Sequence, residues 1–414
     1  MQEHIRVGII GCGSRGRMLT DTLLAFDDVD IIAVCDTYED RTERIRAKVE
    51  KAKGTSPVKY EDYRALIADE QVQAVVITTP WDEHTRMAIE CLYAGKATAM
   101  EVGGAYDLEE CYALVRAWEQ TKTPFMFMEN CCFDRFELLS TALVRAGRLG
   151  EVVHCHGAYS HDLRDEILGG YVNRHYRLEN YRHRNCENYP THALGPIARL
   201  LNVNRGNRMV SLVSVASRAA GLTAFSHTDK NPDPTLAGAT FAQGDIVNTI
   251  ITCAGGETIT LTLDTTLPKY YSREFTVRGT KGLCNQENNM VLLEDDLNVH
   301  AAGKGRILCG RYQDNAEEYT RYLPDIWRNI TEEELRLGHG GMDYLEFREF
   351  FAAMRGEREM PIDVYDAAAW MAVTVLSEKS INEGGAPQQI PDFTGGKWML
   401  RKPEDVVALP NGEE

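Results

Sequence analysis

The chain has 414 residues, of which 43% are hydrophobic and 26% are charged, which is enough apolar material for about two globular domains. Its 45 basic and 62 acidic residues give a net charge of −17, and this excess disfavours nucleic acid or an anionic membrane surface as a partner. No apolar run reaches the roughly 18–20 residues that span a bilayer. The N-terminus has no basic or apolar leader, so we expect a cytoplasmic protein.

The eleven cysteines indicate a reducing compartment. No two of them have the C-x-x-C spacing of a zinc site, and the adjacent pair Cys131 and Cys132 suits neither zinc nor a disulfide framework. Cys35 and Cys253 lie inside apolar runs, where cysteine acts as a small hydrophobic residue.

Strand and helix patterns alternate over residues 1–130. The expected strands are 6–10, 31–35, 74–78, 97–100 and 125–128, and helical patterns between them include 39–49 and 84–93. Such alternation is typical of a doubly wound parallel sheet. We therefore predict an α/β fold with an NAD-binding Rossmann domain over residues 1–130.

A different pattern begins near residue 152. Alternating or β-branched runs at 210–216, 245–253, 258–264, 274–278 and 290–293 follow one another without intervening helices, which predicts a mostly antiparallel sheet. Gly255-Gly256 has the character of a hairpin turn, and Asp363 with Asp366 has the pattern of a helix start, for a helix reaching about residue 378. For residues 131–414 we predict a substrate-binding α+β domain with a large open sheet and C-terminal helices. Its open face favours a homo-oligomer.

Residues 160–188 are rich in Arg, Tyr, His and Asn and show little periodicity. An irregular stretch of this length inside a compact domain is usually a functional loop or a disordered one. The aromatic content favours the functional loop.

A glycine-rich motif, G-x-G-x-x-G, spans residues 11–16. It follows an expected strand, opens a helical pattern and precedes Asp36 at the end of the second strand, which is the context of a dinucleotide-binding turn. The glycines allow a tight turn and a close backbone approach to a pyrophosphate, and the helix N-terminus supplies N–H groups. Asp36 can accept hydrogen bonds from ribose hydroxyls and repels a 2′-phosphate, which favours NAD over NADP. Arg41 could instead favour NADP, but we interpret it as an arginine on a helix surface.

From residue 6 to about residue 130, and on into the second half, the chain resembles the Gfo/Idh/MocA oxidoreductases. The resemblance is carried by Thr78-Thr79-Pro80, His84, Ala94-Gly95-Lys96 and Glu101. With the glycine motif it implies cofactor contacts from Gly11, Gly13, Ser14, Arg15, Gly16, Asp36, Thr79, Pro80, Trp81, His84, Glu101 and Asn130.

Ordinary dehydrogenases of that family carry Glu-Lys-Pro near the nicotinamide, and the lysine serves in proton transfer to the substrate hydroxyl. This chain has Glu101-Val102-Gly103 instead. Because the side chain of valine can neither donate nor accept a proton, Val102 cannot replace the lysine, and simple alcohol oxidation by the usual route is disfavoured.

Six of the eleven histidines lie between His154 and His192. His154 and His156 alternate onto one face of an expected strand, but no carboxylate or cysteine has a convincing ligand spacing, so we expect no metal site. Tyr159 and His161 lie side by side on the opposite face. They are either site residues or half-buried polar residues satisfied by their neighbours.

An apolar helix is expected to begin after Tyr189. Pro190 fits its first position, which places His192 in the first turn. The positive end of a helix lowers the pKa of a histidine and keeps its imidazole neutral, so His192 is either a general base or a structural residue. The adjoining Tyr189 and the polar loop before it favour the base.

A closer resemblance, to glycoside hydrolase family 109, covers about residues 101–344. It is carried by the strings at 128–132 (MENCC), 157–164 (GAYSHDLR), 189–192 (YPTH), 204–208 (NRGNR), 264–268 (DTTLP), 271–272 (YS) and 338–343 (GHGGMD). That family contains NAD-dependent α-N-acetylgalactosaminidases. Matched string by string, its functional positions fall on Glu129, Tyr159, His161, Tyr189, His192 and Tyr271. Residues 165–188, and Asn188 in place of the family's leucine, depart from its pattern.

The resemblance implies a glycosidase that works by oxidation and elimination instead of the usual pair of carboxylates. NAD takes a hydride from C3 of the sugar, a base removes the C2 proton, the aglycone leaves from C1, water adds and the hydride returns. We assign His192 with Tyr189 to the C3 hydroxyl, and Tyr159 or His161 to the C2 proton. Tyr271 completes the catalytic set, and the expected substrate contacts are Glu129, Arg164 and Tyr271.

The expected substrate is a small carbohydrate or glycoconjugate, such as an α-N-acetylgalactosaminide. One alternative is an NAD-dependent sugar or polyol dehydrogenase that releases NADH. The other alternative is a sensor that binds NAD or a metabolite without turnover.

Overall fold

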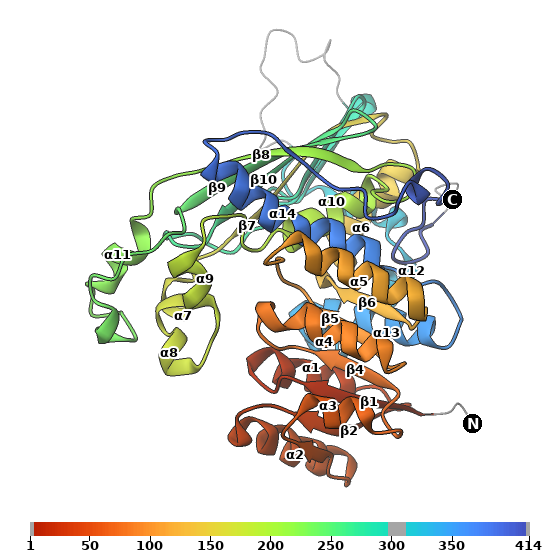
Figure 1. Ribbon diagram of the computed structural model, residues 1–414. Coiled ribbons are helices and arrows are strands. Elements are labelled where there is room, and N and C mark those ends of the chain that lie inside the picture. The colour runs from red at the N-terminus through yellow and green to blue at the C-terminus, as the bar shows by residue number, and fades with distance from the viewer. Residues whose placement is uncertain (1–3, 297–311, 411–414) are drawn as a thin grey trace. The chain divides into compact units, whose positions relative to one another are not determined.

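The chain folds into two compact units, which a computed structural model describes for residues 4–296 and 312–410 (Figure 1). The first unit joins residues 330–368 to the segment that ends at Asn130, and the second unit comprises residues 131–329 and 369–414. Within the described ranges, no helix is both long and apolar enough to cross a membrane.

The first unit is built on a six-stranded parallel sheet with the order β3-β2-β1-β4-β5-β6. Its strands are β1 (Ile5–Ile10), β2 (Val29–Cys35), β3 (Val58–Tyr60), β4 (Ala74–Ile77), β5 (Ala97–Glu101) and β6 (Phe125–Met128). β4, β5 and β6 are buried along their whole length, as expected for a parallel sheet covered on both faces. The predicted Rossmann sheet is therefore confirmed, and β3, which has only three residues, is the strand that the sequence patterns missed.

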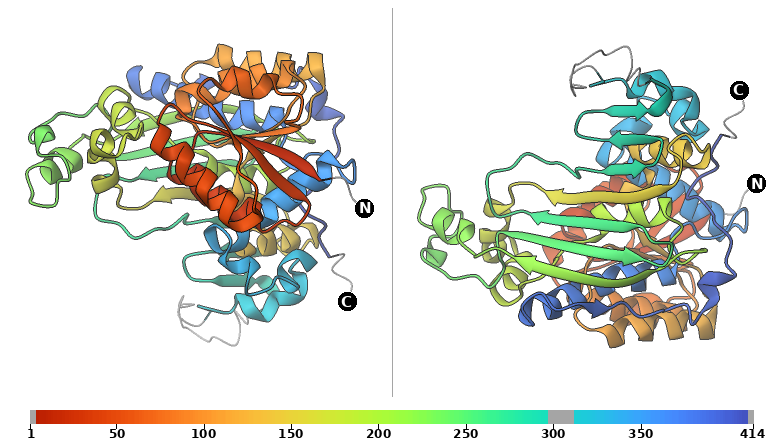
Figure 2. Two further views of the ribbon diagram at one scale, coloured as in Figure 1. Left: turned by 90° about the horizontal axis from the view of Figure 1, so that it is seen from below. Right: turned by 90° about the horizontal axis from the view of Figure 1, so that it is seen from above.

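Helices cover both faces of this sheet. They are α1 (Ser14–Leu24), α2 (Glu39–Lys53), α3 (Tyr63–Ala68), α4 (Trp81–Tyr93), α5 (Leu108–Thr121) and α13 (Met342–Met354), with the 3-10 turns η6 (Glu334–Arg336) and η7 (His339–Gly341) before α13. α1 packs with α2 and α13, and α4 packs with α5. In the left view of Figure 2, the red and the orange helices lie on opposite sides of the sheet.

The second unit contains an eight-stranded sheet with the order β13-β12-β11-β7-β10-β9-β8-β14. Its strands are β7 (Val152–Ser160), β8 (Met209–Ala216), β9 (Ile246–Cys253), β10 (Thr258–Asp264), β11 (Thr276–Gly279), β12 (Gly282–Asn285), β13 (Met290–Leu293) and β14 (Gln388–Gln389). Only the β7–β10 pair is parallel, so the predicted mostly antiparallel sheet is confirmed. The predicted hairpin joins β9 to β10 through Gly256, whose φ of +98° suits glycine.

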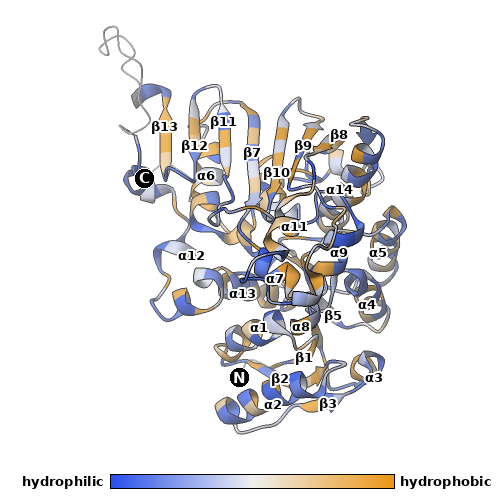
Figure 3. Cartoon of the chain, turned by 90° about the vertical axis from the view of Figure 1, so that its left-hand side faces the viewer, coloured by the Kyte–Doolittle hydropathy of each residue, from blue (hydrophilic) through white to orange (hydrophobic). Residues whose placement is uncertain are grey.

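The two faces of the larger sheet differ in burial. Along β9 and β10, buried and more exposed residues alternate strictly, and Figure 3 shows the same alternation in hydropathy. The buried face packs on α10 (Thr191–Leu200), where a Cβ on Gly157 would lie 2.9 Å from the Ala193 carbonyl oxygen. In the right view of Figure 2, no helix of the described residues lies over the other face, so these residues leave the sheet open on this side.

Residues 160–188 contain three short helices, so the prediction of an irregular loop was wrong in this respect. They are α7 (Arg164–Leu168), α8 (Gly170–Asn173) and α9 (Arg177–His183). Each has four to seven residues, which is too short to leave a helical period in the sequence. Ile167, Leu178 and Tyr181 are buried and hold the segment to the rest of the unit.

Of the remaining described helices, three belong to the second unit and α14 runs along the chain from the first unit into the second. They are α6 (Arg135–Arg145), α11 (Gly221–Ser226), α12 (Asp325–Arg328) and α14 (Val364–Asn382), with the 3-10 turns η1 (Asn130–Phe133), η2 (Pro234–Leu236), η3 (Glu294–Asp296), η5 (Ala316–Tyr322) and η8 (Lys397–Met399). The predicted start of α14 is confirmed, because the Asp363 carboxylate accepts from the backbone N–H of Tyr365 (2.9 Å) and the Asp366 carboxylate accepts from that of Asp363 (3.1 Å). The helix ends four residues beyond the predicted end.

Candidate functional site

The glycine-rich turn between β1 and α1 requires glycine at two of its three glycine positions and is open at the third. Gly11 has a φ of +93°, and a Cβ on Gly16 would lie 2.1 Å from the Gly11 carbonyl oxygen, so both positions require glycine. A Cβ on Gly13 would come no closer than 3.6 Å to another group, the Arg41 guanidinium, so the backbone is open to a ligand there. These are the three roles that glycines play in a dinucleotide-binding turn.

Asp36 follows β2 and braces this turn. One carboxylate oxygen accepts from the Cys12 N–H (2.7 Å) and the other accepts from the Tyr38 N–H (2.8 Å). Because each oxygen has a second lone pair, the carboxylate can still accept from ribose hydroxyls. The residues present therefore fit an NAD molecule. The Arg41 guanidinium lies 4.7 Å from the centre of the Tyr38 ring, at the same end of the site.

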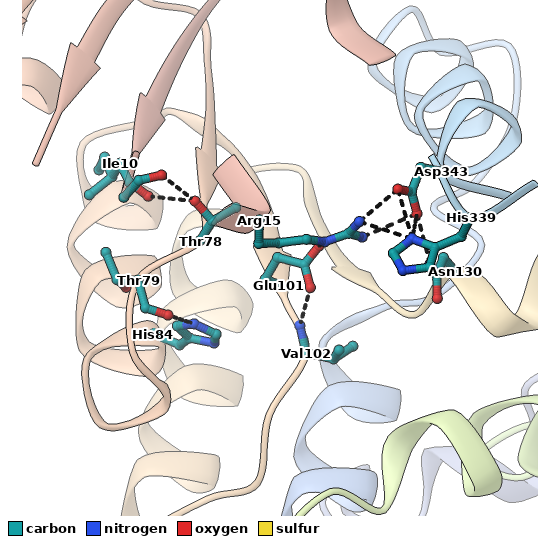
Figure 4. Close-up of polar contacts among 11 residues, drawn as sticks. Ile10, Arg15, Thr78, Thr79, His84, Glu101, Val102, Asn130, His339 and Asp343 are labelled. Carbon is teal, nitrogen blue, oxygen red and sulfur yellow. Dashed lines mark hydrogen bonds and ion pairs between the residues drawn. The ribbon is translucent and has the colours of Figure 1, made fainter. Parts of the chain in front are cut away.

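Arg15, in the first turn of α1, is held by carboxylates (Figure 4). Its Nε donates to Glu101 Oε1 at 2.6 Å, and its two Nη atoms donate to both Asp343 oxygens at 2.6 and 3.1 Å. Burial alone would raise the pKa of Asp343, but Arg15 and His339 outweigh it and hold that pKa below its usual range. The guanidinium therefore ties the glycine-rich turn to β5 and α13.

The loop after β4 and the end of β5 form the neighbouring wall. His84 Nε2 hydrogen-bonds the Thr79 carbonyl oxygen, and burial lowers the pKa of the imidazole to about 4, so His84 is neutral. The buried Trp81 ring leaves no space for a side chain at position 103, since a Cβ on Gly103 would lie 2.5 Å from Trp81 Cδ1. Val102 is buried and donates its backbone N–H to Glu101 Oε2 at 3.1 Å.

Glu129 and Asn130 follow β6 and are both buried. Asn130 Nδ2 donates to Asp343 Oδ1 at 2.7 Å, so the carboxyl end of β6 joins the same network as Arg15. The sequence-predicted cofactor residues thus all lie at or just beyond the carboxyl ends of β1, β2, β4, β5 and β6. The role of Asp343 was missed, although the string Gly340-Gly341-Met342-Asp343 was a signal for it.

Five aromatic side chains of the second unit, Tyr159, His161, Tyr189, His192 and Tyr271, make one contiguous group, the ring cluster. The ring centroids are 4.7 Å apart for Tyr159 and Tyr189, 4.8 Å for Tyr189 and His192, and 5.6 Å for Tyr159 and His192. His161 lies 5.6 Å from Tyr159 and 5.4 Å from Tyr271. The sequence predicted all five members, and the structure brings them together.

Three segments supply the ring cluster. Tyr159 is near the end of β7 and His161 follows it, while Pro190 precedes α10 and puts His192 in the first turn, as predicted. Two backbone hydrogen bonds between Ser160 and Ser272 bring Tyr271 beside His161.

Arg177, from α9, is a member of this site that no sequence pattern indicated. Its guanidinium carbon lies 5.3 Å from the Tyr189 ring centre and 6.0 Å from that of Tyr159, a geometry that stabilises a cation over an aromatic face. Burial raises the pKa of the Tyr159 phenol, and Arg177 opposes that increase. Burial and then Arg177 lower the pKa of His161. Arginines are frequent between residues 164 and 184, so no local signal singled out this one.

The Tyr271 hydroxyl is contacted by Arg273, which also forms ion pairs with two acidic residues. Arg273 donates from Nη1 to the Tyr271 hydroxyl at 3.1 Å, from Nε to Glu137 Oε1 at 2.9 Å, and from Nη2 to Asp134 Oδ2 at 2.9 Å. Both Arg273 and Glu137 are buried. Tyr271 is half-exposed as a residue, yet its hydroxyl is oriented by this pair.

Arg164, a predicted substrate contact, is held elsewhere. Its guanidinium makes two hydrogen bonds to Asp162 (2.6 and 2.8 Å) and lies 4.6 Å from the Phe225 ring centre. On the other face of β7, His154 contacts Thr258 and His156 contacts Glu274. Among the contacts of the described residues, none joins these three side chains to the ring cluster.

Two family models match consecutive parts of the chain. Residues 5–128 match the oxidoreductase family with an NAD-binding Rossmann fold, and residues 133–400 match the C-terminal domain of glycosyl hydrolase 109. An alpha-N-acetylgalactosaminidase of Tannerella forsythia is 34% identical over 96% of this chain and 88% of its own length. A glycosyl hydrolase family 109 protein of Solibacter usitatus is 35% identical over 96% of this chain and 90% of its own.

Solved structures share the fold at lower identity. A levoglucosan dehydrogenase in complex with NADH and levoglucosan has a TM-score of 0.69 at 20% identity and covers 94% of this chain and 100% of its own. A myo-inositol 2-dehydrogenase of Lactobacillus plantarum has a TM-score of 0.66 at 16% identity, with the same coverage. Residues 5–128 have the oxidoreductase fold, residues 133–400 match the hydrolase domain, and the chain belongs to glycosyl hydrolase family 109.

Proposed function

We propose that this protein is an NAD-dependent glycoside hydrolase that acts on an α-N-acetylgalactosaminide or a related glycoside. The observation that carries the proposal is the ring cluster, whose members are phenols and imidazoles and include no carboxylate. Such a group suits proton transfer at carbon and hydroxyl centres, whereas an ordinary glycosidase uses two carboxylates. The name of the Tannerella forsythia relative supports the choice of sugar.

The proposed reaction requires the sugar to pass through a 3-keto form. When bound, NAD would supply the hydride acceptor for C3 and the hydride donor that restores it. His192, with Tyr189, takes the proton of the C3 hydroxyl and later returns it. The ketone at C3 makes the C2 hydrogen acidic, so that a base can remove it and the bond from C1 to the aglycone breaks.

Electrostatics favour His161 over Tyr159 as the base at C2. The lowered pKa of His161 keeps its imidazole neutral and able to accept a proton near pH 7, whereas the raised pKa of Tyr159 keeps its phenol protonated. Tyr159 therefore suits a hydrogen-bond donor to the sugar. For substrate contacts we propose Glu129, Tyr271 and Arg177, because Arg164 is held by Asp162.

The experiment compares chromogenic α- and β-glycosides with and without added NAD, and then repeats the productive reaction in heavy water. The released sugar should carry deuterium at C2 and retain its hydrogen at C3, and NADH should not accumulate. Cleavage with unlabelled C2, after a control for a base shielded from solvent, would contradict the elimination route.

A sugar or polyol dehydrogenase is the second candidate, favoured by the fold shared with levoglucosan and inositol dehydrogenases. Val102 in place of a proton-carrying lysine counts against it. NADH formation without cleavage of the glycosidic bond would select this candidate. The cytoplasmic location and the homo-oligomer expected from the sequence stay predictions.

A further inference from the structure

Glu346, on α13, is a buried acid that has no hydrogen-bond partner among the described residues. The residue is completely shielded from solvent, and within the described part of the chain neither of its carboxyl oxygens has a partner. Asp343, one helical turn earlier, differs because Arg15 and Asn130 donate to its oxygens. An isolated buried carboxylate is very costly, so the group takes the neutral, protonated form.

The charged groups that act on Glu346 come from α1, α13, the end of β5 and the residue after β6. Burial, and then repulsion by Glu101 and Asp343, raise the pKa of Glu346, while Arg15 acts in the opposite direction. Glu129 adds a further, weaker repulsion. Four carboxyl groups therefore face one arginine, and the uncharged state of Glu346 limits the excess of negative charge.

This cluster lies on the nicotinamide side of the sheet. Glu101 ends β5 and Glu129 follows β6, and in a doubly wound sheet the half formed by the later strands holds the second mononucleotide of the cofactor. The oxidised nicotinamide ring carries a positive charge, and the reduced ring carries none. A protonated acid inside a negative cluster is therefore placed to distinguish the two.

We propose that Glu346 recognises the oxidised cofactor, releasing its proton to solvent when the cationic ring binds and keeping it when the neutral ring binds. The inference rests on the NAD site proposed above and is independent of the sugar. It gives the protein a preference for NAD⁺ over NADH, which suits a reaction that consumes the NADH it makes. No redox step is involved, because one proton leaves a carboxylic acid and one positive charge takes its place.

The proposal predicts how affinity depends on pH. Because binding of NAD⁺ releases a proton, its affinity rises with pH, by at most about tenfold per pH unit. The affinity for NADH lacks this dependence. His84 is already neutral over this range, and Arg15 stays charged. His339 contacts both Arg15 and Asp343, so a variant of this residue serves as a control.

The test is calorimetric titration of the whole protein, freed of cofactor, with NAD⁺ and with NADH between pH 6 and 9. Two buffers of different ionisation enthalpy give the number of protons released. We expect up to one proton for NAD⁺ and fewer for NADH, and Glu346→Gln should abolish the difference and lower the preference for NAD⁺ about tenfold at high pH. His339→Asn is the matched control and should keep the proton release.

Equal proton release for the two cofactor forms in the unmodified protein would overturn the inference without any variant. Undiminished release in folded Glu346→Gln would overturn it as well. If neither cofactor form binds, the NAD site and this inference both fail. If NAD⁺ binds with proton release but no glycoside is cleaved, the hydrolase proposal fails and this inference stands.

Discussion

The glycine-rich turn and the ring cluster meet different physical requirements. The turn is made by six consecutive residues, and its geometry depends on backbone atoms, such as the Gly11 carbonyl oxygen that excludes a side chain at Gly16. The ring cluster is made by side chains from three segments that are far apart in the sequence, 159–161, 189–192 and 271. We therefore expect changes in the turn to affect folding and cofactor affinity, and changes in the cluster to affect chemistry alone.

The largest effect is expected at the centre of the ring cluster. His192→Ala should lower turnover by about 10² to 10⁴-fold, which is the range for loss of a general base. Its melting temperature and NAD affinity should stay unchanged, because the residue lies outside the glycine-rich turn. Steady-state kinetics and calorimetry check this prediction.

A histidine on the preceding helix, α9, gives the matched control. His183 lies on the surface of α9 and contacts Glu179 at 3.0 Å, so His183→Ala should keep full activity. If His192→Ala turned over at a near-normal rate, His192 would be a structural residue and the comparison would lose its main support.

Two glycine-to-alanine substitutions separate the contribution of the turn to stability from its contribution to NAD binding. Gly16→Ala introduces a contact of 2.1 Å and should cost about 1–3 kcal/mol of stability together with NAD binding. Gly13→Ala has no contact closer than 3.6 Å and should fold normally, yet it should bind NAD at least tenfold more weakly because its methyl group lies where the backbone is open to the ligand. Thermal melts and cofactor titrations separate the two outcomes, and equal losses of stability would contradict this division.

The sequence predicted the glycine-rich turn more completely than the ring cluster, because only the turn has a motif of fixed spacing. The turn has a fixed spacing that follows from backbone geometry, so its residues and its fold were predicted together. The five rings were predicted from strings that resemble a known family. Arg177 was missed because its position depends on α9, a helix of seven residues with no readable period.

Buried polar networks were the least predictable part. Arg273 reaches Glu137 and Asp134 from a distant segment, and Glu346 has no partner in the described part of the chain. Neither residue belongs to a motif of fixed spacing. Only the folded chain shows which charges are buried side by side.

A smaller effect, on the choice between NAD and NADP, is expected from a substitution of Asp36. Asp36→Asn removes a negative charge while keeping a side-chain oxygen that can accept from the Cys12 N–H. NAD affinity should fall about tenfold, since a hydrogen bond to a charged group is worth about 1.5–3 kcal/mol, and NADP should bind more nearly as well as NAD. Asp40→Asn, on the surface of α2, is the control. Equal affinity of the unmodified protein for the two cofactors would refute the role given to Asp36.

The smallest effect tests whether Arg177 acts on the ring cluster through its charge. His161 must be neutral to accept the C2 proton, so activity falls on the acid side as the imidazole becomes protonated. Burial and Arg177 both lower the pKa of His161. Removing the charge in Arg177→Gln should raise that pKa toward its ordinary value of about 6.5, while burial keeps it below. The acid limb of the kcat/KM profile should then move to higher pH, by less than about one unit, so that the variant loses more activity at pH 5.5 than at pH 8.

Arg182→Gln, on the same helix and in contact with Tyr171, should leave the limb in place. An unshifted limb in Arg177→Gln would mean that the base at C2 lies beyond the reach of this arginine, and the assignment of His161 would then be wrong.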